Sequence, residues 1–80
     1  MRGKFDYINP DIFGNRLKIC MAEQNLTCEA MSEELELSTS SVQNWRRHSG
    51  FPSVDALAGV ADVLNVSIDY LLGRKESKEI

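Results

Sequence analysis

The sequence predicts an all-α fold in which five short helices form one domain. Apolar residues recur at helical spacing along the chain, and no stretch shows the two-residue period of a strand. Residues that cap helix starts stand between these stretches at short intervals. A chain of 80 residues buries roughly 60% of its surface on folding, which is enough for one small core and too little for two.

The first helix is expected to begin at Pro10 and to run to about Gln24. Asn9 can accept backbone N–H bonds at its start, and proline suits the first helical position. Asn25 tolerates the left-handed backbone conformation that ends many helices. Its inward positions at helical spacing are Phe13, Leu17 and Cys20 or Met21.

Two shorter helices follow, separated by a turn of about three residues. Thr27 is the expected cap of the second helix, which ends near Leu35. Ser38 is the expected cap of the third, which runs from Thr39 to about Arg47. The inward stripe of the second helix is Ala30, Met31 and Leu35.

Gly50-Phe51-Pro52 breaks the chain, and Ser53 caps a fourth helix that ends near Leu64. That helix is apolar nearly all round, so we expect it at the centre of the core. Ser67 caps a last helix that Gly73 ends. The predicted organisation is an N-terminal arm at residues 1–8, a domain at 9–73 and a charged tail at 74–80 that frays.

Several classes of protein are excluded. No apolar run approaches the ~18 residues that cross a bilayer, and no secretory signal follows the basic N-terminus, so we expect a cytoplasmic protein without a membrane partner. Cys20, Cys28 and His48 fit no metal-ligand spacing, so we expect no metal and no cofactor. No nucleophile–base pair or phosphate loop is present, so we expect no enzyme. We expect Cys20 in the core, Cys28 at the surface and His48 in a surface turn.

The charge is acidic overall but unevenly distributed. Nine Lys and Arg against twelve Asp and Glu give a net charge of −3 and a pI near 5.0. This balance disfavours a polycation that coats nucleic acid without specificity, but it leaves room for a basic face. Residues 27–37 hold four Glu and no base, whereas residues 38–53 hold two Arg and no acid.

The third predicted helix presents polar side chains on one face. With Thr39 at 0° and about 100° per residue, the positions of Gln43, Ser40 and Asn44 fall near 40°, 100° and 140°. Trp45 falls near 240°, on the side expected to anchor in the core. Amides can bond adenine in the major groove, and Thr or Ser can approach a thymine methyl. An ordinary solvated face is the alternative, although this face carries neither Glu nor Lys.

The stretch from Arg16 to Gly73 resembles the Cro/repressor (XRE-type) helix-turn-helix family without gaps. The matching pieces are Leu26-Thr27, Leu35-x-Leu37-Ser38, Val42-x-x-Trp45, Pro52-Ser53 and the block Leu64-Asn65-Val66-Ser67-Ile68-Asp69-Tyr70-Leu71-Leu72-Gly73. The resemblance implies a five-helix lambda-repressor-like domain whose helix-turn-helix is formed by the second and third helices.

The same resemblance implies a small phage- or prophage-type transcriptional regulator, in most cases a repressor. Such a protein binds a palindromic double-stranded DNA operator as a homodimer. The implied contacts to base edges are Thr39, Ser40, Gln43 and Asn44. The candidate phosphate contacts are Thr27, Cys28, Arg46 and Arg47. For the dimer interface we expect exposed apolar residues of the fifth helix among Ile68, Tyr70, Leu71 and Leu72, with two of these four folded into the core.

Four departures from the family pattern bear on these expectations. Cys28 replaces a glutamine that reaches a phosphate, and Glu36 replaces a turn glycine at a cost of about 1–2 kcal/mol if it stays left-handed. Met21 and Arg46 replace an ion pair, which leaves Arg46 free for a phosphate or for solvent. Ser32 replaces a small alanine and is tolerated if its hydroxyl bonds a backbone carbonyl.

Other functions stay open on the sequence. A protein-interaction module that keeps the fold and has lost DNA binding is favoured by the acidic second helix and by Cys28. An antitoxin-type autorepressor, which would have a protein partner, and a restriction-modification controller use the same small domain.

Overall fold

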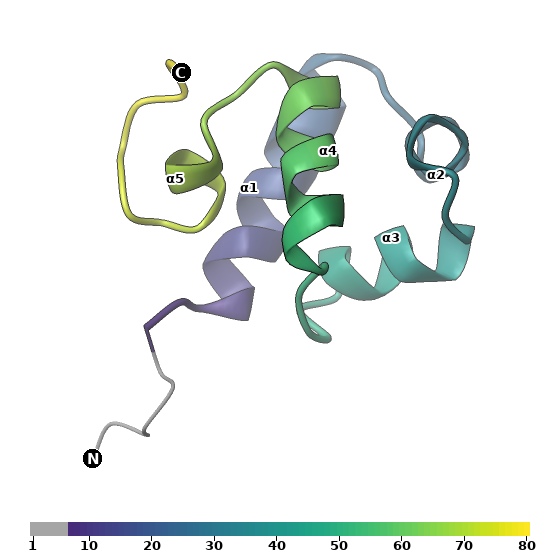
Figure 1. Cartoon of the computed structure of the whole chain (residues 1–80), viewed down its shortest axis with the longest axis horizontal. Coiled ribbons are helices and arrows are strands. Elements are labelled where there is room, and N and C mark those ends of the chain that lie inside the picture. The colour runs from purple at the N-terminus through teal and green to yellow at the C-terminus, as the bar shows by residue number, and fades with distance from the viewer. Residues whose placement is uncertain (1–6) are drawn as a thin grey trace.

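Five helices and no strand make up the regular secondary structure of residues 7–80, the part of the chain that the computed structural model describes (Figure 1). The all-α prediction is therefore confirmed. Each helix begins after a predicted cap whose side-chain oxygen accepts a backbone N–H bond. The helices are α1 Pro10–Glu23, α2 Cys28–Leu35, α3 Thr39–Arg46, α4 Val54–Leu64 and α5 Ile68–Leu71.

The core lies between α1, α4 and the helices that close its ends. Phe13 and Leu17 of α1 are fully buried, as are Met31 of α2 and Val42 of α3. In Figure 1, α3 crosses below α4, α2 lies to one side and α5 to the other. This arrangement places α3 at one end of the molecule, against α1 and α2. The other members of the core cluster are Cys20, Met21, Cys28, Trp45, Val60, Ala61, Leu64, Val66, Tyr70 and Leu71.

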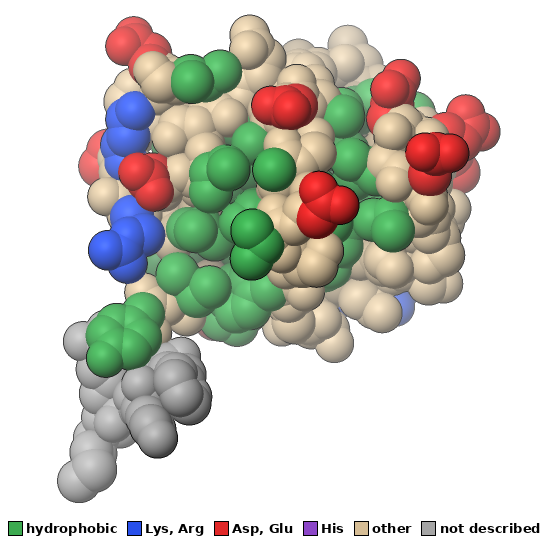
Figure 2. Space-filling model, in the orientation of Figure 1, with side chains coloured by type: hydrophobic (Ala, Val, Ile, Leu, Met, Phe, Trp, Pro, Cys, Tyr) green, Lys and Arg blue, Asp and Glu red, His purple; other side chains and the backbone are tan. Residues whose placement is uncertain are grey.

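The prediction that the fourth helix lies at the centre of the core is wrong. Val60 and Leu64 of α4 are buried, but Val54 is 86% exposed and Asp55 and Asp62 face solvent. Apolar composition does not say how many sides of a helix are covered, and α4 is covered on one side only. In Figure 2, apolar side chains consequently show at the surface over α4 and α5.

The C-terminal tail, residues 74–80, is held against the domain, so the prediction that it frays is wrong. The guanidinium of Arg16 in α1 donates to the carbonyl oxygens of Tyr70 at 2.6 Å and of Lys75 at 2.8 Å. The carbonyl of Lys78 accepts the N–H of the residue that caps α5, at 2.9 Å. These contacts supply partners for carbonyls that would otherwise need water.

Two of the predicted turn features are present. Asn25 ends α1 with φ 54°, and Glu36 ends α2 with φ 55° in the left-handed region, although it carries a side chain. Most of the predicted N-terminal arm (residues 1–6) falls outside the described residues. Within residues 7–80, none of the helices has the length and apolarity needed to cross a membrane.

Candidate nucleic-acid interface

Helices α2 and α3 form a unit joined by a turn of residues 36–38. The left-handed Glu36 ends α2, and the N–H of Leu37 bonds the carbonyl of Ser32 at 2.9 Å. Trp45 of α3 is 7% exposed and meets Phe13 edge-on, with ring centroids 6.5 Å apart. The prediction that Trp45 is a core residue is confirmed, and its packing fixes α3 against α1.

The polar face of α3 is accessible. Ser40 and Asn44 are exposed, whereas Thr39 and Gln43 are half-buried. Ser40, Gln43 and Asn44 therefore lie on the side of α3 away from Val42 and Trp45, as the helical angles predict, and Thr39 lies at the edge of this face that meets α2.

Thr39 is connected to a buried serine in α2. Ser32 is 4% exposed, and its hydroxyl donates to the backbone carbonyl of Glu29 at 2.8 Å. The condition that the sequence sets for a serine at this position is therefore met. The same hydroxyl oxygen lies 3.2 Å from the hydroxyl oxygen of Thr39.

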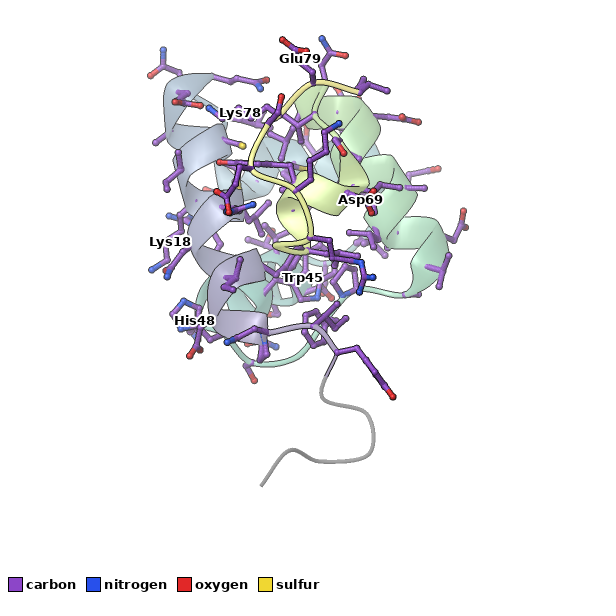
Figure 3. The ribbon with its side chains drawn as sticks, turned by 90° about the vertical axis from the view of Figure 1, so that its left-hand side faces the viewer. Lys18, Trp45, His48, Asp69, Lys78 and Glu79 are labelled. Carbon is purple, nitrogen blue, oxygen red and sulfur yellow. The ribbon has the colours of Figure 1, made fainter. Side chains whose placement is uncertain are left out.

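A basic depression of about 370 Å³ adjoins the polar face of α3. Three of the residues around it carry permanent positive charges, and none carries a carboxylate. Figure 3 shows Lys18 and His48 along the same side of α1. Gln43 belongs both to the polar face and to this depression, so the two features are continuous. The lining residues are Lys18, Cys28, Gln43, Arg46, Arg47 and His48.

Two expectations about residues at this depression are wrong. Cys28 was expected at the surface, but it is only 6% exposed. Arg46 was expected to be free, but Nη1 of its guanidinium lies 2.8 Å from the Sγ of Cys28. With Met21 in place of an ionic partner, the guanidinium is turned toward Cys28 at the start of α2. The Nε of Arg46 is buried and makes no hydrogen bond.

His48 lies in the turn after α3, as predicted, with φ 67°. Its ring is half-buried and is held by α1, because Nδ1 lies 3.2 Å from the carboxylate of Asp11 and Nε2 lies 3.0 Å from the amide oxygen of Asn15. Gly14 of α1 permits this approach. A Cβ on Gly14 would lie 2.4 Å from the His48 ring and 2.7 Å from the carbonyl oxygen of Trp45.

Sequence reasoning missed Lys18 and Gly14 as parts of this site. Both belong to α1, and only the packing of α1 against α3 brings them there. Lys18 stands on the outer face of an amphipathic helix, where a lysine is ordinary. A glycine inside a predicted helix was the one available signal for Gly14, because glycine disfavours helix interiors without a packing reason.

Two of the four candidates for a dimer interface lie in the core. Tyr70 is 8% exposed and Leu71 is fully buried, and the Arg16 guanidinium lies 4.4 Å from the centre of the Tyr70 ring. Because α5 is a single turn, its residues point to opposite sides. Ile68 is 38% exposed, and Leu72, which follows α5, is half-buried, so both stay within reach of a partner.

Four glutamates lie on α2 and in the turn that follows it, and none of them lines the depression. Figure 2 shows acidic side chains gathered over α2. All four of these glutamates are exposed. They are Glu29, Glu33, Glu34 and Glu36.

Two solved structures share this arrangement of helices. The P22 c2 repressor, crystallised with a synthetic operator, matches with a TM-score of 0.75 and 22% identity over 79% of this chain and 96% of that one. The restriction-modification controller protein C.AhdI from Aeromonas hydrophila matches with a TM-score of 0.71 and 22% identity over 78% and 94% of the two chains. The protein therefore has the fold of the small repressor-like helix-turn-helix proteins.

The family within that class is shown by sequence. Residues 19–79 match the family model of the bacteriophage CI repressor helix-turn-helix domain, and the chain belongs to this family. The helix-turn-helix resemblance noted in the sequence is thus confirmed.

Curated relatives are regulators of transcription. ImmR of Bacillus subtilis, a transcriptional regulator, is 33% identical over 79% of this chain and 50% of its own length. RstR of Vibrio cholerae, a cryptic-phage transcriptional repressor, is 34% identical over 69% and 49%. BcrR of Enterococcus faecalis, a transcriptional activator, is 30% identical over 80% and 31%. The chain thus spans half or less of the length of these relatives.

Proposed function

We propose that this protein is a sequence-specific DNA-binding repressor that occupies a palindromic operator as a homodimer. The observation that carries the proposal is the continuity between the polar face of α3 and the carboxylate-free basic depression. A face of amides and hydroxyls can contact base edges in the major groove, while adjacent cations bind the phosphates on either side.

The base contacts come from α3. The amides of Asn44 and Gln43 can each donate to and accept from the major-groove edge of adenine. Ser40 is exposed on the same face and can bond several base edges. Thr39, at the first position of α3, completes the set. Each bidentate contact contributes about 1–3 kcal/mol of discrimination against a wrong base.

The phosphate contacts come from three elements. Lys18 and Arg47 supply charge from the depression. At the start of α2, Thr27 accepts the N–H of Ala30 at 3.1 Å, and its own hydroxyl proton stays available for a phosphate oxygen. The backbone N–H of Cys28 serves the same phosphate in place of its engaged thiol.

Arg46 has a different part in this proposal from the one expected of a free side chain. Its Nη1 donates to the Sγ of Cys28, so Arg46 adds positive charge to the depression from a fixed position. It contributes to phosphate binding through that charge and through its second terminal nitrogen.

The homodimer forms through the exposed apolar side of α4 and α5. Val54 is the most exposed apolar residue of this face, and Ile68 and Leu72 are accessible beside it. A two-fold axis through this face would present two copies of α3 to successive major grooves, about 34 Å apart. Removing apolar surface from water drives such an association.

A binding experiment tests the DNA-reading part of the proposal. Wild-type protein is used to select duplexes from a random-sequence library, and the selected duplex is titrated with Asn44→Ala, Gln43→Ala and Lys18→Ala. The two amide variants lose affinity for the selected duplex only, each by about 1–3 kcal/mol. Lys18→Ala weakens binding to all duplexes equally and lowers the slope of log K against log salt by roughly one.

Two results would overturn this part of the proposal. If the library yields no enriched sequence, the protein does not read DNA. If Asn44→Ala and Gln43→Ala bind the selected and a scrambled duplex as the wild type does, α3 is not the reading element. A reporter gene with the selected duplex across its promoter distinguishes repression, which lowers expression, from the activation that the name of BcrR describes.

A second experiment tests the dimer. Sedimentation equilibrium of Ile68→Asp is compared with that of Ile19→Asp, which alters an exposed isoleucine on α1 instead. Ile68→Asp is monomeric at concentrations where the wild type and Ile19→Asp are dimeric. A wild type that stays monomeric at high concentration contradicts the proposed dimer.

A protein-interaction module without DNA binding is the second candidate, and the acidic α2 favours it. Residues 27–37 carry a charge of −4 beside the proposed phosphate contacts. If the protein is such a module, the wild type and all variants should bind every duplex weakly and equally.

A further inference from the structure

Thr39 and Ser32 share a hydrogen bond whose direction can be assigned. The hydroxyl of Ser32 has a single proton, and that proton is donated to the carbonyl oxygen of Glu29 at 2.8 Å. In the 3.2 Å contact between the two hydroxyl oxygens, Ser32 must therefore accept and Thr39 must donate. The one donor of the Thr39 side chain is thus used within the protein.

The burial of Ser32 keeps the hydrogen bond from Thr39 in place. Ser32 is 4% exposed, so no water competes freely for its hydroxyl, and Thr39 is half-buried at the start of α3. If the bond to Thr39 broke, the Ser32 hydroxyl would keep its donation to Glu29 but would lose the proton that it accepts, which costs free energy at a buried site. The bond therefore persists when α3 approaches another molecule.

Fixing the hydroxyl of Thr39 also fixes its methyl group. Threonine in a helix populates two χ1 rotamers, which differ in the direction of the hydroxyl and of the methyl. The contact with Ser32 selects the rotamer whose hydroxyl points to α2. The methyl then occupies one constant direction, and the side chain offers a partner no hydroxyl proton.

We infer that Ser32 is a specificity-determining residue that makes Thr39 a reader of the thymine methyl group. This inference rests on the proposed binding of operator DNA through α3. A threonine with a free hydroxyl could donate to acceptors on guanine or thymine, but a threonine whose proton is engaged cannot. Because the oxygen is turned toward α2, the group that Thr39 presents to a base is its methyl, and the apolar group in the major groove is the C5 methyl of thymine.

The test uses the duplex selected from the random library by the wild-type protein. Each thymine in one half-site, and then its symmetry mate, is replaced by deoxyuridine, which lacks only the methyl. At one thymine position, the replacement should weaken binding of the wild-type protein roughly fourfold per half-site, which is the effect of one buried methyl group. In Ser32→Ala the freed Thr39 samples both rotamers, and the same replacement should change affinity less than twofold.

Two substitutions at position 39 keep the inference testable if Ser32→Ala does not fold. Thr39→Val keeps a methyl in the same direction and retains the fourfold preference for thymine over deoxyuridine. Thr39→Ser lacks the methyl and should lose the preference for thymine over deoxyuridine. Ser41→Ala is the matched control, because it removes a hydroxyl of α3 that contacts Ser38 instead of α2, and it leaves the preference unchanged.

The possible failures are distinct. If no duplex is enriched, the proposed function fails. If the selected duplex binds but no thymine-to-deoxyuridine change affects the wild type, or if Thr39→Ser retains the preference, Thr39 does not read the methyl. If Ser32→Ala folds and keeps the full preference, Ser32 does not determine it. A structural role for Ser32 alone would lower stability without changing the ratio between the two bases.

Discussion

Replacing Gly14 by alanine tests the close approach of α1 to α3. A Cβ at this position would lie 2.7 Å from the carbonyl oxygen of Trp45 and 2.4 Å from Cδ2 of His48. The carbonyl belongs to the backbone of α3, and the imidazole is held by Asp11 and Asn15. Neither group can move away without the loss of other contacts, so the added methyl must push the two helices apart.

Gly59→Ala is a matched control because it also lies inside a helix. Its Cβ would meet only Cδ2 of Leu35, at 2.8 Å, and this end of a flexible side chain can rotate away. Both substitutions gain up to about 1 kcal/mol because alanine is the better helix former. Overpacking costs about 1–3 kcal/mol, and only Gly14→Ala meets backbone. The free energy of unfolding of Gly14→Ala should therefore be about 1–3 kcal/mol below that of Gly59→Ala.

Thermal unfolding followed by far-ultraviolet circular dichroism measures this difference. For a domain of this size, 1 kcal/mol shifts Tm by about 4–8 °C, so Gly14→Ala should melt roughly 5–20 °C below Gly59→Ala. Urea unfolding gives the same comparison at constant temperature. Equal melting temperatures, or a higher one for Gly14→Ala, would show that the spacing of α1 and α3 does not depend on a glycine.

Three further predictions concern stability. Arg16→Met should lower the free energy of unfolding by about 1.5–3 kcal/mol, because it removes hydrogen bonds made by a charged group. The same substitution should speed proteolysis within residues 74–80. An unchanged cleavage rate would contradict the account of the tail. Glu36→Gly should raise the free energy of unfolding in urea by roughly 0.5–1 kcal/mol, because the relief of left-handed backbone strain exceeds the cost of the greater conformational entropy of glycine in the unfolded chain. A lower free energy of unfolding would refute this prediction. Burial raises the pKa of the Cys20 thiol above its ordinary value, so this thiol ionises first in the unfolded chain. The resulting stability is present below about pH 9 and is lost as the pH rises through the folded pKa. Urea titrations across this range should therefore show a flatter pH dependence for Cys20→Ala, and an identical slope would be the contrary result.

The starts and ends of the helices were predictable because their causes are local. Asn9, Ser53 and Ser67 each bond a backbone N–H two or three residues further along the chain. Asn25 ends α1 through its own tolerance of positive φ. The polar face of α3 was predictable for the same reason, since it depends only on the angle per residue.

Contacts between distant residues were not predictable from one sequence. Arg16 reaches the carbonyl of Lys75, 59 residues away, and Lys18 reaches the depression beside α3. Neither residue differs in its local pattern from a solvated cation on an amphipathic helix. The contact between Arg46 and Cys28 likewise depends on which way the long side chain of Arg46 turns, and no spacing rule records this.

The predicted position of α4 was wrong for a different reason. Its residues alone favour full burial, but a small domain has too few other elements to surround a helix. The side of α4 that other helices cover contains Val60 and Leu64. Val54, at the start of α4, is not covered by any of them and is exposed. The number of covered sides is a property of the whole assembly of helices.

Both ends of α3 are tied to α2. Thr39, its first residue, bonds Ser32, and Arg46, its last, bonds Cys28. The two helices therefore already have, before any ligand arrives, the relative position in which they would meet it. Little conformational entropy then remains to be lost on association, and rigid, preorganised binders keep more of their contact energy as affinity. Loosening either tie should consequently appear in calorimetry as a more unfavourable entropy of binding, even where the contacts in the complex are unchanged.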